Sequence, residues 1–332
     1  MKHKAYLLNV DLLTRIVRSH AHLGILSKKD KTEKAIQLAL TYLYKRSPEM
    51  LQTLEFIIQI EEYHWLTSGK HVTFFDSVET AQALINSSYN IDNAQSLYTG
   101  MDSFMLALPD NLMLGGKPAA SGLLVHVMLH DDRQSMVDKF CKWVGMKHSP
   151  QVTVDDWKGS TFAIYASYQQ KQGSNEYIRF ALPSSSLMEV MRFTTHAEYT
   201  AYMKATNKFK YLMGADLDAP EQAYQYDILR LIVGLMLYKK AMPDRVTAGM
   251  PSSVSTKDVE TRYVQNPQTQ TIHSPATHAG AERGSHYRSW HFRQLMADRF
   301  YKGEHEKAAR GSRVVFVRDS MVNREIDAET VK

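Results

Sequence analysis

The segment TFAIYASYQQKQGSNEYIRFAL, residues 161–182, decides the fold class of this chain. Its two ends, 161–168 and 177–182, are short runs rich in aromatic and apolar residues, which is typical of strands. The polar connector 171–175, with Gly173 at its centre, is typical of a hairpin loop. The segment therefore predicts an antiparallel pair of strands in the middle of the chain.

A third strand is expected upstream of this hairpin. The run LLVHVML, residues 123–129, is apolar except for one histidine, which is typical of a buried strand. The segment 220–241 has apolar residues on nearly every side of a helix, so we expect it to lie deep in the core. Apolar periodicity and capping residues predict further helices over 1–46 with a loop at 27–31, from Ser47 to 66, over 78–85 and over 184–209.

These elements predict an α+β fold with three parts. Residues 1–242 form a mainly helical body around a short, mostly antiparallel sheet. Residues 243–284 have no apolar period and are rich in Ser, Thr, Pro and Gln, which predicts a linker or a long exposed loop. Residues 285–332 form a small basic β module, and it is too short to build its own core. We therefore expect the module to dock on the body or on a partner subunit.

The composition is that of a folded protein in a reducing compartment. The chain has 332 residues, of which 44% are hydrophobic and 23% are charged, and this excludes a disordered chain. The single cysteine, Cys141, precludes an intramolecular disulfide and favours the cytoplasm. The first residues lack the pattern of a secretory signal, and the most apolar run, 228–238, is too short to cross a bilayer. We therefore predict a cytoplasmic location and no membrane segment.

Acidic residues suggest metal sites at three places, but none of them has the spacing of a known metal site. Glu61, Glu62 and His64 fall in one helix without the i,i+4 spacing of paired ligands, and we interpret them as a solvated helix face. The pairs Asp131–Asp132 and Asp155–Asp156 lack the companion spacing Glu-x-Lys or Asp-x-Asp, and Asp is common in turns. We predict no metal ion and no cofactor.

The segment LGGKP, residues 114–118, resembles a phosphate-binding loop only in composition. The spacing between its glycines and Lys117 is wrong for such a loop. Pro118 also stands where the loop requires Ser or Thr. The segment therefore predicts a turn.

Positive charge is concentrated near the end of the chain. The formal net charge is +5, and residues 283–318 contain nine Lys or Arg against three Asp or Glu. This region alone accounts for the surplus, so the rest of the chain is close to balanced. A basic segment beside a neutral body favours a polyanionic partner, most commonly nucleic acid. The alternative is an ordinary solvated basic surface.

The densest part of this region is SHYRSWHFR, residues 285–293. As a strand it would place His, Arg and aromatic side chains on both faces. A basic segment follows, and the run RVVFVR, residues 313–318, predicts a second strand. One face of the first strand would show His286, Arg288, Trp290 and Phe292, and the other Tyr287, Ser289, His291 and Arg293.

The order His-x-Arg-x-x-His-x-Arg, followed by a basic segment and a valine-rich strand, resembles the C-terminal segment of phage and mobile-element proteins of unknown function. The matching residues are His286, Arg288, His291, Arg293 and the strand 314–318. The resemblance covers less than a fifth of the chain. It implies a phage or mobile-element origin and carries no established activity.

The module's composition predicts binding of RNA or single-stranded DNA. Arg and Lys side chains neutralise phosphates, and aromatic rings stack on unpaired bases. A partner in the form of a nucleic-acid-processing complex suits the same surface. The residues expected to bind are Arg288, Arg293, Tyr287, Trp290, Phe292, Arg299, Lys302, Arg310, Arg313 and Arg318.

One alternative is that the aromatic residues only pack the tail against the body and that the histidines are ordinary polar groups, and two functional alternatives also remain open from the sequence. The first is a metal-independent ribonuclease, in which His286 and His291 act as acid and base while Arg288 and Arg293 stabilise the transition state. Strand geometry opposes it, because positions five apart point to opposite faces. The second is a protein-only interaction or inhibitor protein that uses the tail as its docking surface.

Overall fold

The computed structural model of the chain describes most of the body and part of the C-terminal module. The described residues are 2–19, 32–90, 98, 103–129, 132–151, 160–171, 174, 176–191, 193, 196–206, 219–252, 254, 268–274, 287–288, 291–308, 310, 313–317 and 320–321.

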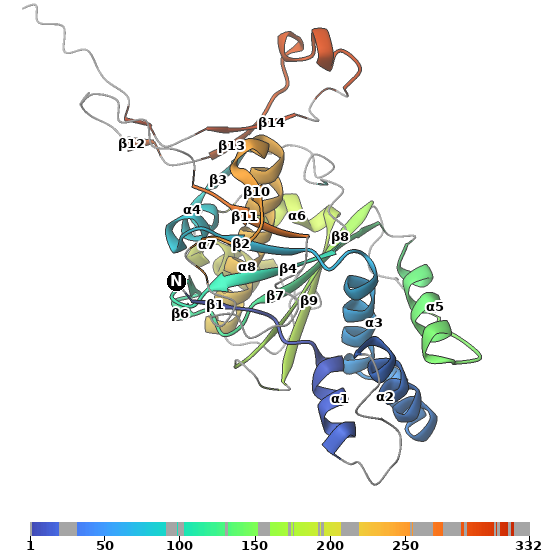
Figure 1. Ribbon diagram of the computed structural model, residues 1–332. Coiled ribbons are helices and arrows are strands. Elements are labelled where there is room, and N and C mark those ends of the chain that lie inside the picture. Colours follow the sequence, from blue (N-terminus) through green and yellow to red (C-terminus); the bar gives the residue numbers. More distant parts are fainter. Residues whose placement is uncertain are drawn as a thin grey trace, which may run out of the picture.

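Eight strands of the described residues form one mixed sheet at the centre of the body (Figure 1). Strands β11, β2 and β4 run parallel, and the other neighbours in the sheet are antiparallel. The α+β class is thus confirmed, but the sheet is larger than expected and is mixed. Its order is β10 (Val246–Ala248), β11 (Thr269–Ile272), β2 (Val72–Phe75), β4 (Ser103–Pro109), β7 (Leu123–Leu129), β8 (Phe162–Gln169) and β9 (Tyr177–Pro183), with β1 (His3–Lys4) on the end of β4.

The predicted hairpin of β8 and β9 and the predicted strand β7 are confirmed. Both faces of the sheet are covered, which explains why β7 is apolar at every position except His126. Leu123, Val125 and Val127 belong to one hydrophobic core, and Leu124 and Met128 belong to the other.

Helices cover both faces of the sheet (Figure 1). The helix predicted over 220–241 is confirmed as α8, whose central residues are fully buried. The helix expected over 184–209 is two helices, and the helix expected from Ser47 begins with a short 3-10 helix, η2 (Pro48–Gln52). One layer holds α1 (Asn9–Ser19), α2 (Thr32–Arg46), α3 (Leu54–Thr67) and α5 (Asp132–Val144), and the other holds α4 (Val78–Asn86), α6 (Ser184–Met191), α7 (His196–Thr206) and α8 (Ala219–Ala241).

The structure corrects the expectation that 243–284 is only a linker. The 3-10 helix η4 (Pro243–Arg245) continues into β10, and β11 lies inside the sheet between β10 and β2. Thr269, Thr271 and Ile272 are buried there. The linker prediction was wrong for these strands, because their short polar sequence gains its partners only from distant segments. Residues 255–267 and 275–284 lie outside the described residues.

The turn predicted over 114–118 is confirmed. It joins β5 (Met113–Leu114) to β6 (Lys117–Pro118) in a small hairpin. Gly115 and Gly116 adopt φ values of 55° and 78°, in the left-handed region that glycine enters most easily. In the part of the chain that the structure describes, no helix combines the length and the apolar character that a membrane crossing requires.

Candidate nucleic-acid interface

The C-terminal module is joined to the body through a strand of the body. β13 (His291–Gln294) pairs in parallel with β3 (Ser88–Asn90) and antiparallel with β14 (Val314–Val317). This three-stranded layer lies at the top of the molecule in Figure 1, next to α8. The expectation that the module docks on the body is therefore confirmed for this layer.

The inner side of the layer is an aromatic contact with the body. Phe292 is fully buried and stacks on Tyr89 of β3, with ring centroids 5.6 Å apart and planes at 11°. Its ring is also 5.1 Å from that of Phe316 in β14, which meets Tyr238 of α8 edge-on at 5.4 Å. Because Phe292 belongs to the core, it offers no face to a base, and its predicted stacking role was wrong.

The single strand expected over 285–293 is replaced by two short strands with different partners. β12 (Tyr287–Arg288) pairs with β15 (Ser320–Met321), whereas β13 joins β3 and β14. The structure describes only the backbone of Tyr287 and Arg288. His286, Trp290 and Arg318 lie outside the described residues, so the proposed histidine pair and two of the predicted contacts have no described geometry.

The outer side of the layer carries the other predicted residues of β13. Residues alternate across a strand, so His291 and Arg293 face away from the buried Phe292. In the register, His291 lies opposite Val317 and Arg293 lies opposite Val315. Arg293 is exposed, and Val315 is 37% exposed. The outer side therefore combines a cation with an apolar patch.

The segment 295–313, called here the basic loop, is closed at its base by hydrogen bonds. Leu295 N donates to Arg313 O over 2.9 Å, and the hydroxyl of Tyr301 donates to Leu295 O over 2.6 Å. Two 3-10 turns, η7 (Asp298–Phe300) and η8 (Gly303–His305), lie within the loop. The described part of the loop thus has a defined backbone that can position its side chains.

Three arginines of the basic loop contact the loop itself. Arg310 Nε donates to Met296 O over 2.5 Å, and its guanidinium pairs with Asp298 at 3.3 Å. The guanidinium of Arg313 donates to Phe300 O. Arg299 lies 4.8 Å from the centroid of the Phe300 ring. These three arginines shape the loop, so only part of their positive charge faces solvent freely.

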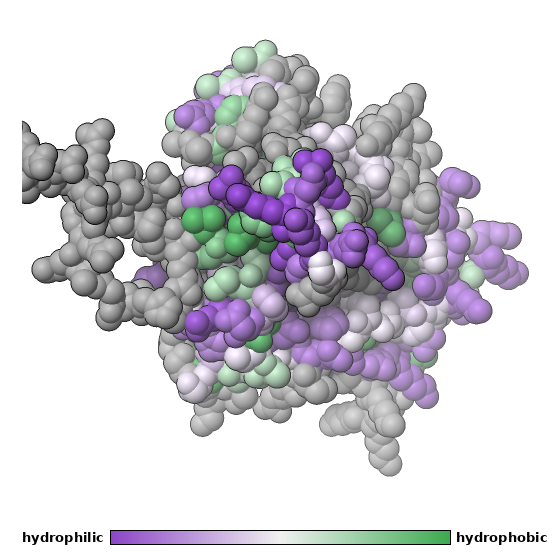
Figure 2. Space-filling model, turned by 90° about the horizontal axis from the view of Figure 1, so that it is seen from above, coloured by the Kyte–Doolittle hydropathy of each residue, from purple (hydrophilic) through white to green (hydrophobic). Residues whose placement is uncertain are grey.

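Three other cations are directed to solvent. Arg293, Lys302 and Lys307 are exposed, and no hydrogen bond or ion pair to another described residue engages their side chains. Figure 2 views the molecule from above and shows many hydrophilic side chains on this face, with smaller apolar patches between them. Lys307 was not among the predicted contacts, although its place in the basic run could have indicated it.

Sequence reasoning missed an acid cluster, defined here as Glu61 and Glu62 of α3 with their partners. The solvated face expected for these residues was wrong, because Glu61 is 2% exposed and Glu62 is fully buried. Glu62 accepts hydrogen bonds from the Tyr6 hydroxyl at 3.0 Å, from Asn9 N at 2.6 Å and from Val10 N at 2.9 Å. It therefore binds free N–H groups in the first turn of α1.

Glu61 is paired with Arg179 of the edge strand β9. Arg179 Nε and Nη2 approach the same carboxylate oxygen at 2.8 and 2.6 Å. The other oxygen of Glu61 accepts a hydrogen bond from the Ser167 hydroxyl at 3.4 Å. The guanidinium also lies 4.6 Å from the centroid of the Tyr165 ring. The pair thus fastens α3 to strands β8 and β9.

Burial changes the acidity of Glu62. Loss of solvent raises the pKa of Glu62 to about 8, while the hydrogen bonds from Val10, Asn9 and Tyr6 act in the opposite direction. The surroundings of the cluster are those of a structural anchor, because each carboxylate is already bound by protein groups. Among the described residues, no three His, Cys, Asp or Glu side chains are placed to hold a metal ion.

A sequence signal for the cluster exists but is weak. The run IIQIEEYHWL, residues 57–66, has apolar residues on several sides of the helix, so it leaves no broad polar face. This pattern indicates that some of its polar residues are buried. The partners Tyr6 and Arg179 are far away in the sequence, and no local pattern indicates them.

Comparisons of this chain with protein-family models, with curated proteins and with solved structures found no match. The functional interpretation therefore depends on the geometry and charge of the basic loop and its neighbours.

Proposed function

We propose that the protein binds single-stranded nucleic acid through the outer side of the β13–β14 layer and the basic loop. The observation that carries the proposal is the set of exposed cations, Arg293, Lys302 and Lys307, which other described residues leave unengaged. Their backbone positions are fixed by the closed loop and by the core contacts of Phe292. Cations held in this way can follow a phosphate backbone.

The proposal favours a single strand over a duplex. Val315 and Met296 are 37% and 46% exposed and lie in the same layer and loop as the cations. Apolar side chains beside cations suit unpaired bases, whose faces are open, better than a duplex, whose bases are stacked inside. Because Phe292 is buried, stacking contributes less than the sequence suggested, and phosphate contacts contribute more.

Fluorescence anisotropy with labelled single-stranded RNA, single-stranded DNA and duplex DNA tests the proposal. We expect binding that weakens steeply between 50 and 200 mM salt, as counterion release requires. The variant Arg293→Ala/Lys302→Ala/Lys307→Ala should reduce the slope of log affinity against log salt by about 2, since each phosphate contact on a single strand contributes about 0.7.

The matched control is Lys45→Ala/Lys142→Ala/Lys204→Ala, which removes three exposed cations from α2, α5 and α7. It changes the net charge by the same amount, so a non-specific charge effect would appear equally in both variants. Equal affinity and equal slope in the two triple variants would contradict the proposal. In that case a protein-binding role for the module would be the better interpretation.

A further inference from the structure

A second site lies at one edge of the central sheet, where β10, β11 and β2 are neighbours (Figure 1). Strands β11 and β2 run parallel, so their carboxyl ends lie side by side, and His273 and Asp76 are the first residues beyond these ends. Thr247 lies opposite Thr271 on the antiparallel strand β10. The topology therefore brings a hydroxyl, an imidazole and a carboxylate together from distant parts of the chain.

These three side chains form a continuous series of contacts. Thr247 Oγ1 lies 2.8 Å from His273 Nε2, and His273 Nδ1 lies 3.4 Å from Asp76 Oδ2. The carboxylate is an acceptor, so the hydrogen of the neutral imidazole belongs on Nδ1, and Nε2 accepts the hydrogen of the Thr247 hydroxyl. This is the order of nucleophile, base and orienting acid in hydrolases that form an acyl intermediate on a hydroxyl oxygen.

The carboxylate of Asp76 is held in place by its surroundings. Its Oδ1 accepts a hydrogen bond from the Thr80 hydroxyl at 2.7 Å, and its Oδ2 accepts one from Ser274 N at 3.0 Å. The backbone nitrogen of Asp76 donates to Ile272 O over 3.0 Å. The carboxylate is therefore fixed before any substrate arrives, as the third member of such a series must be to orient the base.

The backbone of His273 is fixed as well, while its ring is accessible. His273 N donates to Arg245 O over 2.9 Å, and the hydroxyl of Tyr238 donates to His273 O over 2.7 Å. Tyr238 is fully buried in the core, so it ties the position of His273 to helix α8. The His273 side chain is 37% exposed, and Thr247 is exposed. A substrate can therefore reach both the hydroxyl and the imidazole from solvent.

A backbone N–H beside Thr247 can stabilise negative charge. Gly249 N donates to Thr269 O over 2.8 Å, and hydrogen-bonded positions alternate along an antiparallel strand. The N–H of Ala248 therefore points to the other side of β10, where no strand of the described residues pairs with it. The residue after a nucleophile often supplies such an N–H to the oxygen of the tetrahedral intermediate. Ala248 N occupies that position here.

We propose that Thr247, His273 and Asp76 form a catalytic triad that hydrolyses carboxylic esters. Thr247 Oγ1 bonds to the carbonyl carbon while its proton passes to His273 Nε2. The bond between that carbon and the alcohol oxygen then breaks, and His273 gives the proton to the departing alcohol. Water next attacks the acyl-threonine, and its proton passes through His273 to Thr247 Oγ1 as the carboxylic acid leaves. One ester and one water thus give one acid and one alcohol.

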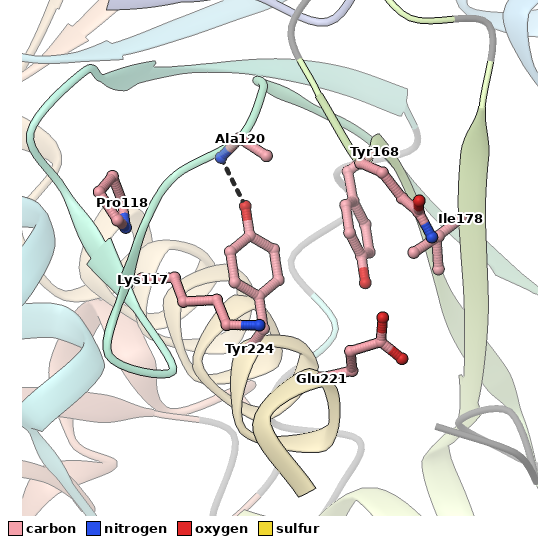
Figure 3. A pocket seen from close by; sticks show the side chains of 8 residues that line it. Lys117, Pro118, Ala120, Tyr168, Ile178, Glu221 and Tyr224 are labelled. Carbon is pink, nitrogen blue, oxygen red and sulfur yellow. Dashed lines mark hydrogen bonds between the residues drawn. The ribbon is translucent and has the colours of Figure 1, made fainter. Parts of the chain in front are cut away.

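The surroundings of the triad favour a small, uncharged ester. The carboxylate of Asp76 disfavours an anionic substrate such as a phosphate ester. The cavity of about 240 Å³ drawn in Figure 3 lies elsewhere, because it is lined by residues such as Lys117, Tyr168 and Tyr224. An acyl group on the exposed Thr247 is in contact with solvent, so a short acyl group suits the site. The triad is separate from the basic loop and does not depend on nucleic-acid binding.

Hydrolysis of p-nitrophenyl acetate by the full chain tests the triad. We expect turnover above the rate in buffer, and protein quenched with acid during turnover should carry an acetyl group on Thr247 in peptide mass mapping. Thr247→Val keeps the branched shape of the side chain and removes the hydroxyl, so it should lower the rate at least about 100-fold. Thr247→Ser keeps the hydroxyl and should retain the rate within about tenfold.

Two variants test the other members of the triad. His273→Gln removes the base and should lower the rate at least about 100-fold, and Asp76→Asn should lower it at least about tenfold because the imidazole loses its orienting partner. The matched controls are Thr67→Val and His148→Gln, which alter exposed residues of the same kinds in other parts of the chain. Both controls should hydrolyse the ester like the wild type.

The controls are needed because surface lysines and histidines also react with this ester. Circular dichroism of each variant separates a loss of catalysis from a loss of folding, and the rescue by Thr247→Ser does so independently. A Thr247→Val variant that is as fast as the wild type, or acetyl groups only on lysines, would overturn the proposal. The same loss in His148→Gln as in His273→Gln, or no turnover above the rate in buffer, would overturn it as well.

Discussion

The acid cluster and the basic loop both concentrate charge of one sign, and they use it in opposite ways. In the acid cluster, Glu62 accepts three hydrogen bonds and Glu61 is bound by Arg179. In the basic loop, Lys302 and Lys307 are exposed and no described residue engages them. Charges that the fold itself neutralises hold elements together, whereas charges left in solvent on a fixed backbone are available to a partner.

The physical reason for this difference is the cost of removing a charge from water. A buried carboxylate without a partner is strongly unfavourable, so burial of Glu61 and Glu62 required donors from distant segments. An exposed lysine has no such requirement, because water solvates it. The comparison therefore predicts that equal changes of charge have very unequal effects on stability in the two regions.

The largest loss of stability is expected for Glu61→Ala, because this change leaves the guanidinium of Arg179 buried without its partner. Breaking a buried ion pair in this way costs about 3–5 kcal/mol. The free energy of unfolding, measured by urea denaturation with a circular dichroism signal, should fall by that amount. The pair is 2.6 Å long, and its side chains are 10% and 2% exposed.

The exposed pair of Lys70 and Glu33 provides the control for this measurement. Its atoms are 3.0 Å apart, but the two side chains are 31% and 70% exposed. Glu33→Ala should therefore lower the free energy of unfolding by no more than about 1 kcal/mol. Similar losses in Glu61→Ala and Glu33→Ala would remove the distinction between the two regions.

The next largest loss of stability is expected for Phe292→Ala. This variant tests how the basic loop is attached to the body. Truncation of a buried Phe costs about 3–5 kcal/mol, and we expect the lower end, because Phe292 lies in a layer at the margin of the core. The loss should appear as faster amide hydrogen exchange in β13 and β14 before it appears in α8.

The adjacent position supplies the control for Phe292→Ala. Arg293→Ala alters the same strand on its exposed side, and it should change stability by less than about 0.5 kcal/mol. Arg293→Ala should instead weaken nucleic-acid binding. A large loss of stability in Arg293→Ala, or none in Phe292→Ala, would show that the two sides of the layer are assigned the wrong way round.

The sequence predicted those elements whose apolar pattern is complete within one segment. Strand β7 and helix α8 have such patterns, and so has the hairpin of β8 and β9. The sequence did not predict strand β11. Its polar sequence TQTI becomes a strand only because β2 and β10 lie on either side of it. The size of the sheet was underestimated for the same reason.

The candidate site was predicted in its charge but not in its geometry. Clustered Lys and Arg are visible in the sequence, so the basic character of the loop was found. The buried side of β13 is set by Tyr89 and that of β14 by Tyr238, and both tyrosines lie far away in the chain. A local pattern could not show that Phe292 faces inward while Arg293 faces outward. The burial of Glu62 was missed for the same reason, because its partners Tyr6, Asn9 and Val10 are distant.

The smallest change in the free energy of unfolding is expected for each unit of pH as Glu62 titrates. Burial raises its pKa to about 8 in the folded protein, against about 4.3 in an unfolded chain. Between these values the folded state holds one more proton than the unfolded state, so the free energy of unfolding should decrease as pH rises from about 5 to 8. Each unit of pH within this window changes the free energy of unfolding by at most about 1.4 kcal/mol, so the change per unit is smaller than the loss in Glu61→Ala. Urea denaturation at several pH values measures how the free energy of unfolding depends on pH, and this dependence should be flatter in Glu62→Gln than in the wild type. The control is Glu79→Gln, at an exposed position of α4, which should keep the wild-type dependence. A slope that Glu62→Gln leaves unchanged, or a stability that rises with pH across this window, would show that the donors from Tyr6 and α1 outweigh burial and keep the carboxylate ionised.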